Sequence, residues 1–339
     1  MKKYIQYHQE QAGFCNIWLN LEMLLAVGHI TNRDILIGDV FHYDADPIYK
    51  TKPEPVWSIL DKDALKKEFP VLEPNVYTSG ATGIQHDFNV CFFDSSFITQ
   101  EDDFSLFSAN RTSLIDCNRE ENNISLNGPI GSFCYNVYSG TKEERNILKK
   151  KINKALLYQQ KYVDIAEQLI KSKCDNFNAV HFRYPFFRDE VDANPQKLLE
   201  QLILLFDKDV PLYIATDFVY TNIQYGRTMD IEDYIGPLRK HFKQIILLSD
   251  FNLNLTYSEE IAIDQLICVM SSKFYGTYYS TFSKRINILR GIQGKQAQDY
   301  MGWNEIQEPW QEIKSPFPWN NFNGQWPWHY SSYLQYTYE

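Results

Sequence analysis

The feature that most constrains this chain is a regular alternation of short apolar segments with amphipathic segments in its second half. Apolar runs occur at residues 179–182, 212–215, 244–248 and 273–276, and a stretch of ten or more residues with helical spacing follows each of them. Strands that alternate with helices of this length need crossover connections, which give a parallel sheet covered on both faces. We therefore predict an α/β domain here.

The predicted helices of this domain have recognisable starts. Thr141 to Glu144 forms a capping box, and apolar residues then recur at helical spacing to about Lys173, which predicts one long helix. Asn194-Pro195 opens the next helix, because Asn caps a helix well and Pro fits its first turn. Further helices are predicted at 231–242, 259–270 and 281–290.

The N-terminal end repeats the pattern over a shorter length. Residues 4–7 and 34–37 read as strands, 11–16 as a loop and 17–30 as a helix with one apolar face. The sequence thus predicts two Rossmann-like domains, one at 1–140 and one at 141–300.

Two regions give weaker patterns. Between residues 40 and 140 only a strand at 88–93 can be predicted. Residues 301–339 hold five of the seven Trp and several Pro, which indicates an irregular tail. We expect this tail to pack back on the N-terminal half; the alternative is that its aromatic faces stack on an acceptor sugar.

Charge and hydropathy exclude several classes of function. The 339 residues include 33 Lys and Arg against 43 Asp and Glu, a net charge of −10, which disfavours binding to nucleic acid or to anionic membranes but permits a local basic phosphate pocket. No apolar run is long enough to span a membrane, and the opening residues lack the core of a signal peptide. We expect a soluble, cytoplasmic protein without a membrane span.

Polar residues follow the predicted strands at the carboxyl edge of the sheet, where open parallel sheets bind their ligands. They are His181 and Arg183, Asp217, Asp250, and the run Ser280–Ser283. A helix start rich in hydroxyls is a ready anion site, and Arg is the usual bidentate partner of phosphate. The alternatives are ordinary N-capping by Ser280 or Thr281 and pairing of Arg183 with Asp189 or Glu190.

These features favour a phosphorylated ligand, most simply a nucleotide. The glycine-rich loops of common ATPases and nicotinamide enzymes are missing from the sequence. Asp44-x-Asp46 is similar to the metal-binding pair of many sugar transferases, but such pairs recur at Asp61-x-Asp63 and Asp207-x-Asp209, and the seven His show no ligand spacing. We expect no metal site.

Three blocks, in the same order along the chain, resemble the GDP-fucose protein O-fucosyltransferases. The first is Gly13-Phe14-Cys15-Asn16 with Leu21-Glu22; the second is His181-Phe182-Arg183 with Tyr213-Ile-Ala-Thr-Asp217; the third is Asp264-Gln265, Phe274-Tyr275-Gly276 and Ser280-Thr281-Phe282-Ser283 with Arg290.

The resemblance implies the GT-B architecture, in which two Rossmann-like domains face one another across a cleft. It makes 1–140 the acceptor-side domain and 141–300 the nucleotide-sugar-binding domain. It also implies an inverting, metal-independent transfer of fucose from GDP-fucose to a hydroxyl of a protein or glycan acceptor. Two alternatives stay open: the same fold with another nucleotide deoxysugar, and a non-catalytic protein that binds a nucleotide sugar or glycan.

The resemblance also implies roles for single residues. Arg183 would bind the β-phosphate and stabilise the departing GDP, and Asn16 would orient that phosphate or the acceptor. His181 and Asp264 would contact the ribose or guanine. The remaining donor-binding candidates are Gly13, Phe14, Asp217, Ser280, Thr281 and Phe282.

The general base is the open point of the resemblance. Family members usually carry an Asp shortly after the His-x-Arg, whereas residues 184–187 here are Tyr-Pro-Phe-Phe. Glu22, Asp189 and Glu190 are the candidate bases, with proton removal assisted by the donor phosphate as the alternative.

Overall fold

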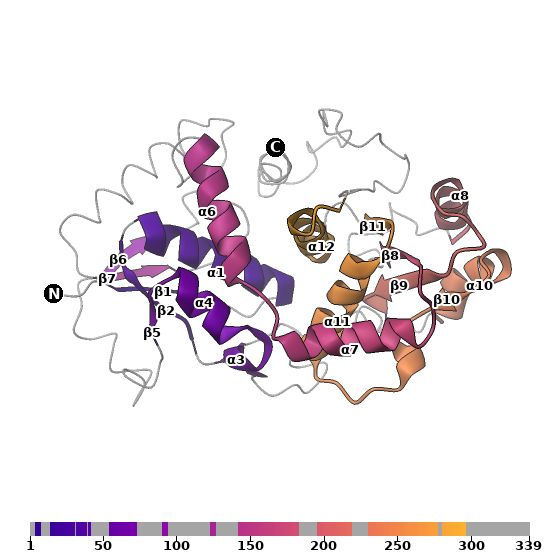
Figure 1. Ribbon diagram of the computed structural model, residues 1–339, viewed down its shortest axis with the longest axis horizontal. Coiled ribbons are helices and arrows are strands. Elements are labelled where there is room, and N and C mark those ends of the chain that lie inside the picture. Colours follow the sequence, from indigo (N-terminus) through magenta and orange to yellow (C-terminus); the bar gives the residue numbers. More distant parts are fainter. Residues whose placement is uncertain are drawn as a thin grey trace. The chain divides into compact units, whose positions relative to one another are not determined.

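The structure is a computed structural model that describes residues 4–7, 14–30, 32–38, 40–41, 54–72, 90–93, 123–126, 142–182, 195–218, 230–276 and 280–295. The described residues form two compact units, the first up to residue 159 and the second from residue 160 on. Each unit is built on a parallel sheet with helices packed against it (Figure 1). The predicted α/β class is therefore confirmed.

The first unit has a five-stranded sheet in the order β5-β2-β1-β7-β6, and all neighbouring strands run parallel. Its strands are β1 (Tyr4–Tyr7), β2 (Asp34–Leu36), β5 (Val71–Leu72), β6 (Val90–Phe93) and β7 (Asn123–Leu126). A small antiparallel pair, β3 (Val40–Phe41) and β4 (Glu54–Pro55), completes the described strands of this unit. The sequence pattern predicts β1, β2 and β6 but gives no sign of β5 or β7.

Helix α1 (Phe14–Ile30) packs on β1 and β2. It begins three residues before the predicted start, so residues 14–16 form its first turn rather than a loop. Its predicted apolar face is buried, Trp18 and Leu25 included. Gly28 allows the close approach to the sheet, because a Cβ at this position would lie 2.6 Å from the Ile35 side chain.

The single helix predicted from residue 141 to about 173 is wrong. The structure has two helices, α6 (Lys142–Ala155) and α7 (Gln160–Lys171). The segment between them bonds to the residues that link two short helices, α3 (Val56–Ile59) and α4 (Lys62–Glu68). There the Asp61 amide donates to the Leu157 carbonyl and the Gln159 amide donates to the Ile59 carbonyl. These bonds occupy backbone groups that one continuous helix would have used.

Helix α6 packs against α4 and α1, which places it in the first unit. The sequence-based division at residue 140 assigns the same helix to the second domain, and that division stays a prediction. The Trp-rich segment 301–339 lies outside the described residues, so its predicted packing on the N-terminal half also stays a prediction.

The second unit has a four-stranded parallel sheet in the order β10-β9-β8-β11. Its strands are β8 (Asn178–Phe182), β9 (Leu212–Thr216), β10 (Ile245–Ile246) and β11 (Phe274–Gly276). The other elements are α8 (Pro195–Leu205), α10 (Glu232–His241), the 3₁₀ turn η5 (Leu248–Phe251), α11 (Tyr257–Met270) and α12 (Thr281–Ile292). Each of the four predicted strands and four predicted helices has its counterpart here.

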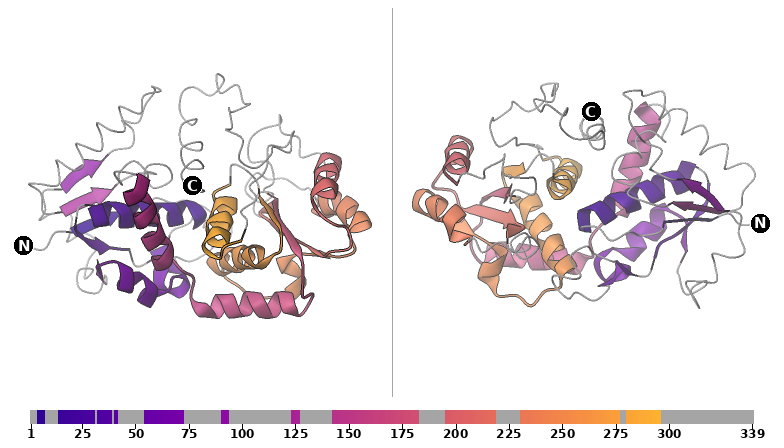
Figure 2. Two further views of the ribbon diagram at one scale, coloured as in Figure 1. Left: turned by 45° about the horizontal axis from the view of Figure 1, so that its top comes forward. Right: turned by 180° about the vertical axis from the view of Figure 1, so that it is seen from behind.

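The two faces of this sheet carry different side chains, because successive residues of a strand point to opposite faces. Val180 and Ile214 join an apolar cluster with residues of α8 and α10, such as Leu202 and Leu238. The alternate residues face α11 and α12, which lie on the other side of the strands (Figure 2). The predicted site residue His181 is on this second face.

Candidate donor-binding site

The described part of the candidate site is on the α11 and α12 face of the second sheet. His181 is the next-to-last residue of β8 and is only 3% exposed. Its Nδ1 lies 2.7 Å from the Ser283 Oγ, in the first turn of α12. The Phe282 ring packs against the imidazole with a centroid separation of 4.4 Å. The structure therefore brings two of the predicted donor-binding residues, His181 and Phe282, together.

A glycine makes this contact possible. Gly276 is the last residue of β11 and pairs with His181 in the parallel ladder. A Cβ at position 276 would lie 2.5 Å from the Ser283 Cβ and 2.6 Å from its Oγ, closer than real Cβ atoms approach. Helix α12 can therefore rest on the sheet at this point only because the strand ends in glycine.

A second polar pair joins the same face to α11. The Tyr213 hydroxyl on β9 donates a short hydrogen bond to an Asp264 carboxylate oxygen. Burial raises the pKa of Asp264 to about 7; the bond from Tyr213 opposes this rise and the nearby Glu260 adds to it. Burial, with Asp264 alongside, also raises the pKa of Tyr213 well above its usual value, so this phenol stays protonated and acts as the donor.

The N-terminus of α12 lies next to these pairs. Ser280 is the N-cap residue and is buried, but its side chain makes no capping hydrogen bond, which argues against the ordinary capping role considered from the sequence. Thr281 and Phe282 are half-buried. The Gln265 amide reaches the Phe282 carbonyl at 3.4 Å, which ties this turn to α11. Partial positive charge collects at such a helix start and favours an anion.

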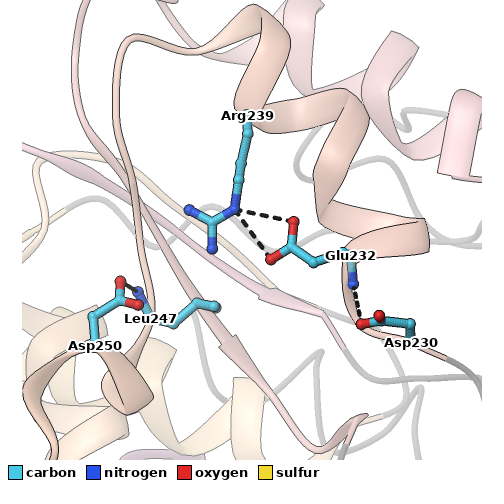
Figure 3. Close-up of polar contacts among 5 residues, drawn as sticks. All are labelled: Asp230, Glu232, Arg239, Leu247 and Asp250. Atoms are coloured by element: carbon cyan, nitrogen blue, oxygen red, sulfur yellow. Dashed lines mark hydrogen bonds and ion pairs between the residues drawn. The ribbon is translucent and has the colours of Figure 1, made fainter.

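Two other acidic residues follow strands of this sheet. Asp217 comes directly after β9 and is half-buried. Asp250 lies in η5, where its carboxylate accepts a hydrogen bond from the Leu247 amide at 2.9 Å (Figure 3). Asp250 therefore has a local capping role. In the same figure, Arg239 pairs with Glu232 along α10, with 3.3 Å between the arginine Nε and the glutamate Oε1.

Three of the catalytic and donor-binding candidates lie in the first unit, and their surroundings differ. Phe14 is buried in an aromatic cluster, 5.6 Å from Trp18 and 6.4 Å from Tyr158 between ring centroids. Asn16 lies in the first turn of α1. Glu22, a candidate base, is only 1% exposed. Packing thus accounts for Phe14, and the functional roles of all three stay predictions.

The other catalytic and donor-binding candidates, Arg183, Asp189 and Gly13, lie outside the described residues, as does Glu190. The same is true of the Asp44-x-Asp46 pair. The two similar pairs have structural roles, because Asp61 accepts from two backbone amides at the start of α4 and Asp207 accepts from the Asp209 amide.

Metal ligands do not gather in the described ranges. Among these residues no group of three His, Cys, Asp or Glu side chains is placed to hold an ion. Within the same part of the chain no helix combines the length and the apolar character that crossing a membrane requires. The cytoplasmic location stays a prediction.

Sequence reasoning assigned no individual role to three residues that shape this face, namely Tyr213, Gly276 and Ser283. Each lies in a block that carries the family resemblance. The bond between Tyr213 and Asp264 joins residues that are 51 apart in the chain, and the one between His181 and Ser283 joins residues that are 102 apart. Residue spacing along the sequence carries no signal for such pairs; the strand register reveals them.

Comparison with known proteins agrees with this geometry. The family model of GDP-fucose protein O-fucosyltransferases matches residues 81–293, more than half of the chain. No curated protein sequence matches the chain significantly.

Three solved structures illustrate the likeness. A crystal structure of POFUT1 in complex with GDP is similar with a TM-score of 0.58 at 12% identity, over 88% of this chain and 99% of that one. POFUT1 in complex with GDP-fucose has a TM-score of 0.53 at 13% identity, over 88% of this chain and 97% of that one. The fucosyltransferase NodZ from Bradyrhizobium has a TM-score of 0.53 at 13% identity, over 85% of this chain and 92% of that one.

At such identities these structures show the fold, a GT-B-type α/β fold with Rossmann-like units, as the sequence predicts. The match of the family model covers β8, β9, β11 and all of α12, and the matched stretch includes His181, Asp217 and Ser280–Ser283. The chain belongs to the GDP-fucose protein O-fucosyltransferase family.

Proposed function

We propose that this GDP-fucose-dependent fucosyltransferase transfers fucose to a hydroxyl of a protein or glycan acceptor, with inversion at the anomeric carbon and without a metal ion. The observation that carries the proposal is the polar face beneath α11 and α12. There the rings of His181 and Phe282 pack against one another beside the start of α12, at the carboxyl edge of the sheet. This is the edge at which open α/β sheets bind nucleotides.

The donor would lie along this edge. The backbone amides at the start of α12, with the hydroxyls of Ser280 and Thr281, suit a diphosphate. The half-buried ring of Phe282, backed by the His181 imidazole, offers an aromatic surface for the nucleoside. Asp264 and Asp217 offer carboxylates for its ribose hydroxyls or its base. Arg183 follows β8 by one residue, and we assign it to the β-phosphate, because a guanidinium binds phosphate through two parallel hydrogen bonds.

The chemistry follows from where charge develops. An acceptor oxygen attacks the anomeric carbon from the side opposite to GDP, the bond to the β-phosphate oxygen breaks, and the acceptor hydroxyl loses its proton. Negative charge grows on the departing diphosphate, and a preorganised donor aimed at it is worth about 3 to 4 kcal/mol. Arg183 would supply that stabilisation in place of a metal. For the proton we retain Glu22, Asp189, Glu190 and the donor phosphate as candidate acceptors.

The test measures GDP release from GDP-fucose with a panel of protein and glycan acceptors, with and without EDTA. We expect Arg183→Ala to lower the rate by a factor of about 100 to 1,000. Arg239→Ala is the matched control, because Arg239 is an exposed arginine of the same unit that pairs with Glu232 on its own helix, and it should change the rate less than twofold. A wild-type rate in Arg183→Ala would contradict the assignment.

Two further measurements separate the alternatives. NMR of the product gives the anomeric configuration, and retention would contradict the inverting mechanism. A thermal-shift panel of nucleotide sugars identifies the donor, since a ligand present at 100 times its Kd adds about 2.7 kcal/mol of stability. Stabilisation by GDP-fucose without transfer to any acceptor would favour the non-catalytic binding protein.

A further inference from the structure

We propose that Ser283 is a positioning residue that holds the His181 imidazole in the orientation needed to bind the donor, and that Gly276 is required because it lets Ser283 reach that ring. The inference rests on the proposed function, in which His181 contacts the nucleotide. It adds a second layer to the site, made of residues that need not touch the donor.

Three elements meet at this point. His181 and Gly276 are side by side in the ladder between β8 and β11, and Ser283 of α12 lies over Gly276. The parallel register sets the positions of the first two residues, and the missing Cβ sets the height of the third above the sheet. The Oγ of Ser283 then lies 2.7 Å from Nδ1 of His181, within the range of a good hydrogen bond.

A hydrogen bond at Nδ1 fixes two properties of an imidazole. It holds the ring plane, and it gives Nδ1 a partner in either neutral tautomer, because a hydroxyl can donate to a bare ring nitrogen or accept from a protonated one. Both His181 and Ser283 are 3% exposed, so water has little access to replace the hydroxyl. Loss of the hydroxyl would leave Nδ1 without this partner, and the ring would turn to find another.

Phe282 links this bond to the proposed ligand surface. It precedes Ser283 on α12, and its ring lies at 32° to the imidazole plane, with the two centroids 4.4 Å apart. A turn of the imidazole would therefore disturb the aromatic surface that we assign to the nucleoside, so a change at Ser283 should be felt in donor affinity.

Gly276 acts through the same contact. An alanine at position 276 would collide with the Cβ and Oγ of Ser283 and would lie 3.0 Å from the Phe274 ring. Helix α12 would have to move away from the sheet, which would lengthen the bond to His181. Removal of the Ser283 side chain would relieve most of that collision.

The experiment uses GDP as the probe, with its Kd measured by calorimetry, and the ¹⁵N NMR signal of the His181 Nδ1 in the full chain without ligand. The signal is assigned by its disappearance in His181→Gln. We expect Ser283→Ala to weaken GDP binding about 3- to 10-fold, the usual range for one hydrogen bond, and to shift the Nδ1 signal. Ser283→Cys keeps the shape of the side chain with a slightly larger volume but hydrogen-bonds weakly, so it should behave like the alanine variant.

A buried serine at the opposite end of the unit is the matched control. Ser271 donates to the Cys268 carbonyl at 2.7 Å and accepts a bond from Arg290. Ser271→Ala should lower stability but leave the GDP Kd and the Nδ1 signal unchanged. Gly276→Ala should shift the Nδ1 signal as Ser283→Ala does, and it should cost less stability in a Ser283→Gly background than in the wild type.

The outcomes separate the two proposals. If the wild type binds GDP, and Ser283→Ala leaves both the Kd and the Nδ1 signal unchanged, the positioning role is overturned and the proposed function stands. If Ser283→Cys binds GDP like the wild type, packing rather than the hydrogen bond is responsible, which also overturns it. No binding of GDP by the wild type would overturn the proposed function, and with it the donor-binding role of His181.

Discussion

The two faces of the sheet in the second unit are built from alternate residues of the same strands, yet they differ in chemistry. On the α8 and α10 face, Val180, Ile214 and Leu202 belong to a continuous apolar cluster. On the α11 and α12 face, His181 and Tyr213 form hydrogen bonds to Ser283 and Asp264. One set of strands thus supports a stabilising core and a polar site.

The difference shows how the fold separates stability from binding. An apolar contact releases free energy on burial, whereas a buried polar group costs free energy unless it is paired. The raised pKa of Asp264 is a sign of that cost. Substitutions on the apolar face should therefore change mainly stability, and substitutions on the polar face should change binding and pH dependence.

The largest expected effect is on the apolar face. Leu202 on α8 is fully buried in the cluster, so Leu202→Ala should lower the free energy of unfolding by about 3 kcal/mol through lost burial and the cavity left behind. Urea unfolding measures this loss. Under conditions in which the variant stays folded, its Kd for GDP should match that of the wild type.

Leu204 on the same helix is the control, because its side chain is 76% exposed. Leu204→Ala should change the free energy of unfolding by less than about 0.5 kcal/mol. A Leu202→Ala variant that loses GDP affinity while fully folded would break the proposed separation of the two faces.

The next effect is a pH dependence on the polar face. Burial raises the pKa of Asp264 to about 7 from 3.8, so between about pH 4 and pH 7 the folded protein keeps a proton that the unfolded chain has lost. The contribution of this group to stability is therefore full below about pH 4 and is lost as the pH rises through about 7. Asp264→Asn removes this titration.

The measurement is urea unfolding of both proteins at about pH 5 and about pH 7.5. The wild type should lose on the order of 2 kcal/mol relative to Asp264→Asn over this interval. If the free energy of unfolding changed equally with pH in the two proteins, Asp264 would be ionised throughout this range. Burying its carboxylate would then cost little free energy.

The smallest effect concerns the Tyr213 hydroxyl. Tyr213→Phe removes the donor to Asp264 but keeps the buried ring, and it should cost about 1 kcal/mol of stability, the usual value of one hydrogen bond. Because this bond lowers the pKa of Asp264, the variant should also move the titration upward in pH. In a double-mutant cycle, Tyr213→Phe should cost less in the Asp264→Asn background, and additive effects would indicate that the pair is not coupled.

The sequence predicted the second unit well because its periodicity is clear. Strands β8 to β11 and helices α8 to α12 appear near the predicted residues, since apolar spacing reports directly on a chain segment and its own buried face. The prediction failed between residues 156 and 159, where bonds to the segment around Leu60 interrupt the helix. Helical spacing continues through such a break, so the pattern alone cannot reveal it.

The first unit shows the opposite case. Strand β7 pairs with β1 and β6 in the middle of the sheet, but its four residues lie in a stretch without usable periodicity. Helix α4 was also missed, although Asp61 caps it. Short elements of this kind owe their form to neighbouring strands and helices, so local sequence carries little information about them.

For the candidate site, the sequence by itself determined which residues follow each strand, and hence that His181, Asp217 and Ser280–Ser283 lie at the carboxyl edge of one sheet. Only the tertiary structure decided that His181 meets Ser283 across Gly276 and that Tyr213 meets Asp264. The physical reason is that the order of residues fixes where a strand ends. Which side chains share a face depends on the register between strands and on how closely a helix can approach them.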